Sequence, residues 1–174
     1  MVSNEQINVI KRNGRGKESL DIDKIHSMVG FATEGITGVS ASHVEMNSGL
    51  QFFDGISTDD IQQILIKSAN DLISLESPNY QYVAARLLLF SLRKSLHHRL
   101  WEHPKFITHI KKLVELGLYD KGILDNYTEA EIDRMGMWID HERDYSFTYA
   151  GLRQVMDKYL VQDRSTGEIF ETPQ

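Results

Sequence analysis

The run NYQYVAARLLLFSLRKSL, residues 79–96, carries apolar side chains on most faces of one helical pattern. A helix of this kind has little polar surface to turn toward water, so it must pass through the interior of the folded chain. We expect Tyr80 and Tyr82 to pack there and the helix to reach the surface at Arg93 and Lys94. A basic pair in the last turn also suits the negative end of the helix dipole. The other segments must therefore supply the layers that cover this helix.

A β-hairpin is predicted near the N-terminus. Residues 6–12, QINVIKR, alternate in the manner of a strand, and the Asn-Gly dipeptide that follows is a strong hairpin-turn signal. Residues 17–22, KESLDI, would return antiparallel to the first strand. Asp23 is then placed to cap a helix with a stripe of apolar residues from Ile25 to Ala32.

Capping signals and helical periodicity occupy most of the remaining chain. Ser57 and Asp60 have the spacing of a capping box ahead of a helical pattern, and Thr128 and Glu131 repeat that spacing. The tail carries two short strand-like runs around a Ser-Thr-Gly turn. Because helices predominate and strands are short, the predicted fold class is α+β, mostly helical.

The helices beyond residue 100 are shorter and amphipathic. The run HPKFITHIKKLVELG is predicted to end at Gly117, and a later helical stripe includes Trp138, which we expect to pack. We therefore predict two packed segments, residues 1–98 and 99–174, with no linker of low complexity between them.

Composition excludes several classes of protein. The 174 residues contain no cysteine, which rules out disulfides, zinc–thiolate sites and thiol catalysis in this chain. The formal net charge of −6 argues against a protein that coats nucleic acid. The sequence has no apolar run long enough to span a membrane and no secretory leader, so we expect a cytoplasmic location and neither nucleic acid nor membrane as partner.

Basic residues gather around the predicted hairpin of this acidic chain. Lys11 and Arg12 end the first strand, and Lys24 lies in the first turn of the following helix, whose amides add partial positive charge. Glu18 and Asp21 suit a base amino group or ribose hydroxyls. A nucleotide site and a solvated hairpin both fit this pattern. The run contains neither a Walker loop nor a Rossmann fingerprint.

Other polar clusters are interpreted as surface features. The pair His97-His98 ends a helix, where imidazoles are usually exposed, and no metal site is expected. The run Asp140–Asp144, DHERD, is interpreted as a solvated helix boundary, because adjacent side chains point in different directions. No nucleophile is accompanied by a base, so we predict no catalytic residue.

Three runs together resemble the ATP-cone of the large subunit of class I ribonucleotide reductases, of the aerobic bacterial and phage type. They are VIKRNGRGKESLDIDKIH, FFDGISTDDI and YQYVAARLLLFSLRK. The later runs LVELGLYDKGILDNYTEAEIDRM, IDHERDYSFTYAGL and KYLVQDRSTGEIFE resemble the helical segment that precedes the catalytic barrel of that subunit. The resemblance covers essentially the whole chain.

The resemblance implies a fold and a function. The cone would be a short hairpin or three-stranded sheet capping a helical bundle, followed by a helical segment and a short C-terminal hairpin. ATP at the cone keeps such enzymes active, and dATP inhibits many of them by changing how the subunits assemble. The expected ligand is ATP or dATP as an allosteric effector, with or without Mg²⁺, and no other cofactor is expected in this chain.

Residues of the site are carried over by motif. Lys11 and Arg12 would meet the phosphates and ribose, Lys24 and the distant Lys94 would reach phosphate, and Thr58 would lie near the adenine or ribose. The full set implied for ATP or dATP is Lys11, Arg12, Glu18, Ser19, Leu20, Asp21, Ile22, Asp23, Lys24, Thr58, Gln62 and Lys94.

The chain departs from the family pattern in three places. Related bacterial enzymes often have histidine where this chain has Gln62, at a position that helps distinguish activator from inhibitor, so inhibition by dATP does not follow from the resemblance. The hairpin has one extra residue between Gly14 and Glu18. The sequence ends at Gln174, before the cysteines and the substrate site of the family's barrel.

The expected role is therefore regulatory. The partners implied are the remaining catalytic-barrel portion of the large subunit, in the same or a separate chain, the small radical-generating subunit, and a second large subunit. The whole enzyme would be a thioredoxin- or glutaredoxin-dependent reductase, and this chain alone is expected to be inactive. Two alternatives remain: a structural interaction module with a degenerate cone, and a nucleotide-sensing regulator of transcription, which the lack of cysteine and the acidic charge disfavour.

Overall fold

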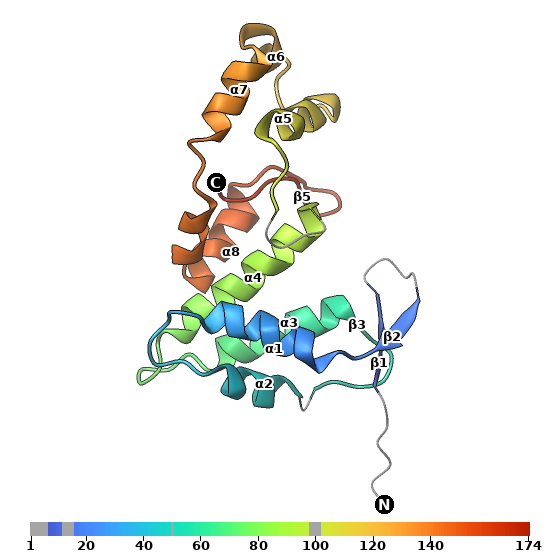
Figure 1. Ribbon diagram of the computed structural model, residues 1–174, viewed down its shortest axis with the longest axis vertical. Coiled ribbons are helices and arrows are strands. Elements are labelled where there is room, and N and C mark those ends of the chain that lie inside the picture. Colours follow the sequence, from blue (N-terminus) through green and yellow to red (C-terminus); the bar gives the residue numbers. More distant parts are fainter. Residues whose placement is uncertain (1–6, 12–15, 50, 98–101) are drawn as a thin grey trace, which may run out of the picture. The chain divides into compact units, whose positions relative to one another are not determined.

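The computed structural model describes residues 7–11, 16–49, 51–97 and 102–174 (Figure 1). The chain divides into two compact units: Met1–Leu88 with Phe147–Ala150, and Leu89–Ser146 with Gly151–Gln174. Helix α4 (Tyr80–His97) contributes to both units. The predicted class is confirmed, because helices predominate among the described residues and the strands form one sheet of three and one of two.

The first unit is built on a small sheet. Strand β1 (Asn8–Ile10) pairs antiparallel with β2 (Lys17–Ser19) and parallel with β3 (Ile56–Ser57), so the strand order is β2-β1-β3. The predicted hairpin is confirmed, with strands shorter than the sequence pattern suggests. The amide of Lys11 donates to the carbonyl of Gly16 at 3.2 Å and closes the described part of the hairpin.

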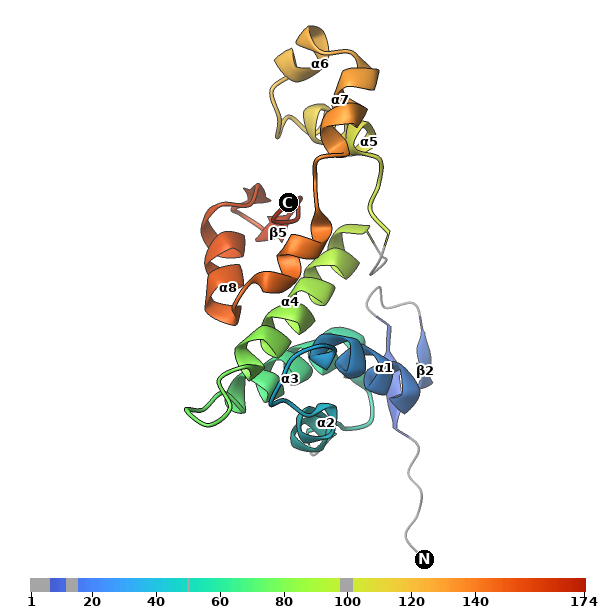
Figure 2. The same cartoon turned by 60° about the vertical axis from the view of Figure 1, so that its left-hand side comes forward.

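Three helices accompany this sheet: α1 (Ile22–Thr33), α2 (Ala41–Gly49) and α3 (Thr58–Asp71). Figure 2 shows α2 close to α1 and α3, and the three contribute buried side chains to one interior. The predicted apolar stripe of α1 is confirmed, since Ile25, Val29 and Ala32 are buried. The predicted cap is wrong: Asp21 caps α1, because its carboxylate accepts the amide of Lys24, while Asp23 lies inside the first turn.

Helix α4 has the buried character that its sequence predicts. Its first turns contribute Tyr80, Val83, Ala84 and Leu87 to the interior of the first unit. The Tyr80 hydroxyl accepts the amide of Ser40 at 3.0 Å, which confirms its packing role.

The second unit consists mainly of short helices. These are α5 (Phe106–Glu115), α6 (Gly122–Asn126), α7 (Glu129–Gly136), the 3₁₀ helix η1 (His141–Ser146) and α8 (Tyr149–Lys158), followed by the antiparallel strands β4 (Gln162–Asp163) and β5 (Glu168–Ile169).

In the second unit, two of three features predicted from the sequence are confirmed. The capping box of α7 is confirmed in both directions between Thr128 and Glu131. Gly117 follows α5 with a φ of +71°, a conformation that glycine adopts without strain. The packing predicted for Trp138 is wrong, since 77% of this residue is exposed. Trp138 lies two residues beyond the end of α7 at Gly136, so the helical stripe that predicted its packing does not continue to this position.

Helices α5 and α7 pack closely, and Gly136 makes this possible (Figure 1). Their shared apolar cluster is centred on Ile107, Ile110 and Ile132. A Cβ atom at position 136 would lie 2.5 Å from the Phe106 Cβ and 3.1 Å from its Cγ. Both atoms are too close to the α5 backbone to move aside cheaply.

We therefore predict that Gly136→Ala lowers the free energy of unfolding by about 1–3 kcal/mol in urea titrations followed by circular dichroism. Gly30→Ala is the control, because a Cβ there meets nothing within 4 Å. It should leave stability unchanged or raise it by up to about 1 kcal/mol. Equal stability of the two variants would contradict the proposed close contact.

Candidate functional site

The sheet register relates three of the predicted site residues: Lys11, Glu18 and Thr58. Val9 pairs with Glu18 on β2 and with Ile56 on β3, and Ile10 pairs with Ser57. Continued by one residue, this register places Lys11 beside Thr58, the first residue of α3. Because side chains alternate along a strand, Lys11 and Glu18 share the face of Val9.

Lys11 and Glu18 form an ion pair at the end of the hairpin. The distance from the Lys11 Nζ to the Glu18 Oε2 is 2.8 Å, and both side chains remain accessible to solvent. The hydrogen bond from Lys11 lowers the pKa of the Glu18 carboxyl, so this group is ionised at neutral pH. The pair presents one cation and one carboxylate side by side to any ligand above the sheet.

The start of α1 carries a second such pair. The Asp21 carboxylate caps the helix through the Lys24 amide at 3.2 Å, and the Lys24 Nζ lies 3.3 Å from the same carboxylate. The backbone hydrogen bond from Lys24 lowers the pKa of Asp21. The Leu20 amide donates to the Ile7 carbonyl at 2.8 Å, which attaches this helix start to β1. Ser19 ends β2, and the first turn of α1 contains Ile22, which is 70% exposed, and Asp23.

The start of α3 completes this end of the first unit. Ser57 caps the helix by accepting the Asp60 amide at 3.0 Å, and Thr58 follows, half-buried. Gln62 lies one turn further along and is buried at 4% exposure. Its Nε2 donates to the Leu87 carbonyl of α4 at 2.9 Å. Gln62 therefore connects α3 to α4, and a direct contact with nucleotide stays a prediction.

The sequence did not predict one pair of hydrogen bonds, which joins Asp54 to Asn8 in the first unit. The Asp54 carboxylate accepts both the amide of Asn8 at 2.8 Å and its side-chain nitrogen at 3.0 Å. These bonds lower the pKa of Asp54 and fix the loop before β3 against β1. Residues 46 apart in sequence form this link, so no local pattern could indicate it.

The contacts of the first unit do not include two of the predicted residues. Arg12 lies outside the described residues. Lys94 is exposed in the last part of α4, within the second unit. The described residues of the group are thus Lys11 and Glu18 on the hairpin, Asp21 and Lys24 at the start of α1, and Thr58 at the start of α3. The amides and dipoles of the two helix starts favour an anion.

Comparison with known protein families identifies this part of the chain. The model of the ATP cone domain matches residues 7–95, which include all the described site residues and Lys94. The chain belongs to the ATP-cone family.

Relatives extend the similarity beyond the cone. The chain is 48% identical over 171 residues to ribonucleoside-diphosphate reductase 1 subunit alpha of Escherichia coli (strain K12), and 46% identical over 168 residues to the corresponding alpha subunit of Enterobacteria phage T4. These matches cover 98% and 97% of the chain but only 22% of each relative. The matched part is the N-terminal region of these alpha subunits.

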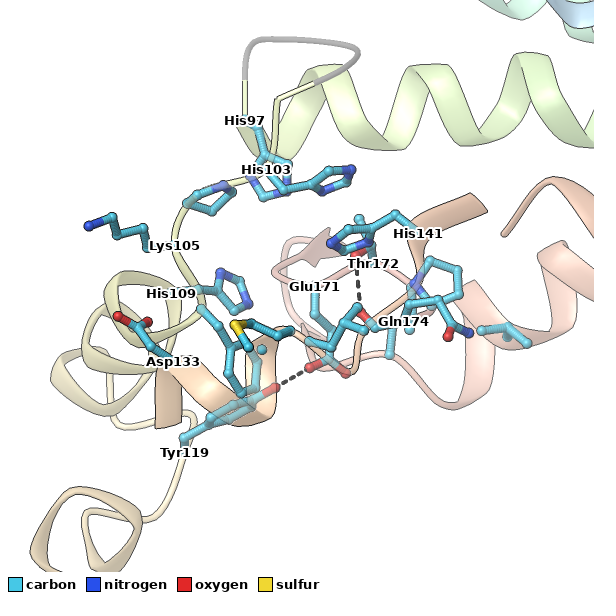
Figure 3. Close-up of a pocket in the computed structure, with 18 of the residues that line it drawn as sticks. His97, His103, Lys105, His109, Tyr119, Asp133, His141, Glu171, Thr172 and Gln174 are labelled. Atoms are coloured by element: carbon cyan, nitrogen blue, oxygen red, sulfur yellow. Dashed lines mark hydrogen bonds between the residues drawn. The ribbon is translucent and has the colours of Figure 1, made fainter. Parts of the chain in front are cut away.

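Beyond the cone, the second unit contains a cavity of about 750 Å³ (Figure 3). Imidazoles from separate elements line it: His97 ends α4, His103 precedes α5, His109 belongs to α5 and His141 begins η1. The rings of His103 and His141 are stacked with centroids 3.5 Å apart, and His97 lies 5.7 Å from His103. On the opposite wall, Tyr119 donates to Glu171.

The histidine environment disfavours positive charge. Burial, followed by the nearby cationic groups, lowers the pKa of His97 and of His103 to about 4. Burial also lowers the pKa of His109 and His141. The expectation of an exposed imidazole is therefore wrong for His97, which is half-buried and in ring contact with His103 and His109. His98 lies outside the described residues.

A buried ion pair lies beside this cluster. The Arg93 guanidinium is 2% exposed and Asp144 is 1% exposed, with 3.2 Å between Nη2 and Oδ2. The predicted surface positions are therefore wrong for Arg93 and for Asp144, since η1 packs on this part of α4 and covers the two groups. Asp140, Glu142 and Arg143 of the same run are exposed, as predicted. Burial raises the pKa of Asp144, against the opposing effect of Arg93.

Among the described residues, no group of three or more His, Asp or Glu side chains is arranged to hold a metal ion. None of the helices that the structure describes is long and apolar enough to cross a membrane.

Proposed function

We propose that this chain is the N-terminal regulatory region of a ribonucleoside-diphosphate reductase alpha subunit and that its cone binds ATP and dATP as allosteric effectors. The observation that carries the proposal is the Lys11–Glu18 pair of the hairpin, with Lys24 and Thr58 at two helix starts, inside the segment that matches the ATP cone model. The effector would adjust the rate of deoxyribonucleotide synthesis by the complete enzyme.

The proposed binding mode divides the residues by charge. Lys11, Lys24 and Lys94, together with Arg12, would bind the triphosphate through charge-assisted hydrogen bonds. Glu18 and Asp21 would accept hydrogen bonds from ribose hydroxyls or the adenine amino group, and both are ionised at neutral pH because their pKa values are lowered. Thr58 would lie beside them. A triphosphate would compete with these carboxylates for the two lysines, and Mg²⁺ can accompany it.

The remaining residues of the set would shape the site. Ser19, Leu20, Ile22 and Asp23 lie between the end of β2 and the first turn of α1, where the partial positive charge of the helix start would favour a phosphate. Gln62, one turn after Thr58, would support the site indirectly, by holding α3 against α4 through its hydrogen bond to the Leu87 carbonyl. Binding of dATP would not by itself imply inhibition by dATP, because this chain has Gln62 where related enzymes often have histidine.

Catalysis would require the rest of the alpha subunit. This chain has no cysteine and spans about a fifth of the length of its relatives, so the catalytic barrel, the substrate site and the thiols reduced by thioredoxin or glutaredoxin would lie outside it. The proposed partners are that barrel portion, the small radical-generating subunit and a second alpha subunit. A cytoplasmic location accords with this role.

The test is calorimetric titration of the chain with ATP and then with dATP. The parent chain should bind ATP, and Lys11→Ala should weaken binding by about tenfold, because one charge-assisted contact contributes about 1.5–3 kcal/mol. Lys67→Ala is the matched control: Lys67 is equally a paired, exposed lysine of the first unit, but it pairs with Asp71 at the far end of α3.

Equal affinity of the parent and Lys11→Ala chains would show that the site is placed wrongly. Binding of neither nucleotide, both by the chain alone and with the barrel portion added, would contradict nucleotide regulation and favour a structural module. Binding of ATP without dATP would indicate an activator-only cone.

A further inference from the structure

Lys11 and Lys24 are each paired with a carboxylate of the first unit. The Lys11 Nζ lies 2.8 Å from the Glu18 Oε2, and the Lys24 Nζ lies 3.3 Å from the Asp21 Oδ2. All four side chains remain accessible to solvent, so a ligand can reach them. Together these groups carry no net charge, because each positive charge has a negative partner.

The two pairs lie within electrostatic range of each other. Glu18 belongs to β2, and Asp21 follows shortly after it as the cap of α1. The hydrogen bond from Lys11 lowers the pKa of Glu18, the charges of Lys11 and Lys24 lower it further, and the charge of Asp21 raises it. Glu18 is therefore the carboxylate through which the two pairs affect one another, and it is ionised at neutral pH.

A polyphosphate that binds Lys11 must displace the Glu18 carboxylate. The displaced carboxylate then lies beside an anion, and repulsion between like charges lowers the affinity. A nucleoside offsets this cost, because ribose hydroxyls and an adenine amino group donate hydrogen bonds that an ionised carboxylate accepts. An inorganic polyphosphate presents acceptor oxygens, which cannot offset the cost.

We propose that Glu18 is a specificity-determining residue of the cone: it competes with phosphate for Lys11, so that a polyphosphate binds well only when an attached nucleoside donates hydrogen bonds to Glu18. This inference rests on the proposed function, in which Lys11 binds the triphosphate. A carboxylate beside a phosphate site is then useful, because specificity can come from a group that repels the wrong ligand. The ligands rejected in this way are inorganic polyphosphates.

The test measures the affinity of the chain for ATP and for sodium tripolyphosphate by calorimetry. Ionic strength and pH are kept constant, since salt screens exposed charges. Glu18→Gln removes the negative charge and keeps the size of the side chain, and circular dichroism checks that the variant is folded. The side chain is accessible to solvent, so the amide should be tolerated.

Glu18→Gln should change the two affinities in opposite directions. The affinity for tripolyphosphate should rise about threefold, because the competing ion pair is exposed and contributes modestly. ATP gains the same factor but loses a charged acceptor that contributes about tenfold, so its affinity should fall about threefold. The preference for ATP over tripolyphosphate should therefore fall about tenfold.

A double-mutant cycle separates competition for Lys11 from a general effect of charge. In the Lys11→Ala background, the gain in tripolyphosphate affinity from Glu18→Gln should disappear, because the lysine for which the two anions compete is absent. A general electrostatic effect would raise the affinity in both backgrounds. Asp71→Asn is the matched control: it makes the same acid-to-amide change in the exposed Lys67–Asp71 pair at the far end of α3 and should change neither affinity.

The outcomes distinguish the inference from the proposed function. If the parent binds ATP and folded Glu18→Gln keeps the same preference for ATP over tripolyphosphate, the inference is overturned and the cone remains a nucleotide site. A gain in tripolyphosphate affinity that persists in the Lys11→Ala background also overturns it. If the parent chain does not bind ATP, alone or with the barrel portion, the proposed function fails and the inference fails with it.

Discussion

Asp144→Ala is expected to lower the free energy of unfolding of the chain by about 3–5 kcal/mol. The change leaves the Arg93 guanidinium, which is 2% exposed, without its counter-charge in the interior of the second unit. The hydrogen bonds to the His141 carbonyl and Tyr145 hydroxyl do not replace a negative charge. Urea unfolding at neutral pH, followed by circular dichroism, measures the loss directly.

Two further variants test whether burial of charge is the cause. Glu129→Ala breaks an exposed ion pair with Lys111 and should lower the free energy of unfolding by less than about 1 kcal/mol. Replacing both buried partners, Arg93→Met with Asp144→Leu, should recover much of the stability lost in Asp144→Ala, because no unpaired charge remains. A loss as small in Asp144→Ala as in Glu129→Ala would mean that Arg93 reaches solvent.

Mild acid is expected to destabilise the chain through the histidine cluster. The pKa of His97 and of His103 is about 4 in the folded chain, against an ordinary value of 6.5. The unfolded chain therefore binds more protons between these two pH values, and stability falls as pH decreases from about 6.5 toward 4. Well above pH 6.5 both states are neutral at these positions, so the slope that they contribute disappears there.

The expected loss between pH 7 and pH 5 is about 1 kcal/mol for each of the two histidines, after allowance for their partial exposure to solvent. Neighbouring charges also change the pKa of these histidines. Arg93 and Lys112 lower the pKa of His97, while Glu171 raises that of His109 and Asp140 raises that of His141. Urea unfolding at a series of pH values measures the slope for the parent chain and for His97→Gln with His103→Gln. The double variant should show a flatter slope over this range, and equal slopes would contradict the assignment.

Much of the fold follows from local signals in the sequence. The Asn-Gly turn and the alternation before it predict the hairpin, and Ser57 and Thr128 mark two helix starts that the structure confirms. These features depend on contacts between residues a few positions apart, which a sequence displays directly. The exchange of Asp23 for Asp21 as the cap of α1 shows the limit of this information, because both residues precede the same apolar stripe.

The candidate site is only partly local. Basic and acidic residues around the hairpin indicate an anion site, but the parallel pairing of β1 with β3 is what places Lys11 near Thr58. That pairing is formed by segments more than 40 residues apart, and the Asn8–Asp54 hydrogen bonds reinforce it. The sequence also contains no local signal for Gln62 binding to the Leu87 carbonyl.

The sequence alone determined which residues are charged, where α3 and α7 begin, and that the segment of residues 79–96 would be buried over most of its length. Only the tertiary structure decided the environment of particular polar groups. Arg93 looks like a partner of the helix dipole, and Asp144 like a solvated acid, until η1 folds against α4 and removes both from water. The physical reason is that helical periodicity specifies the direction of a side chain, whereas its solvation depends on which distant segment packs over it.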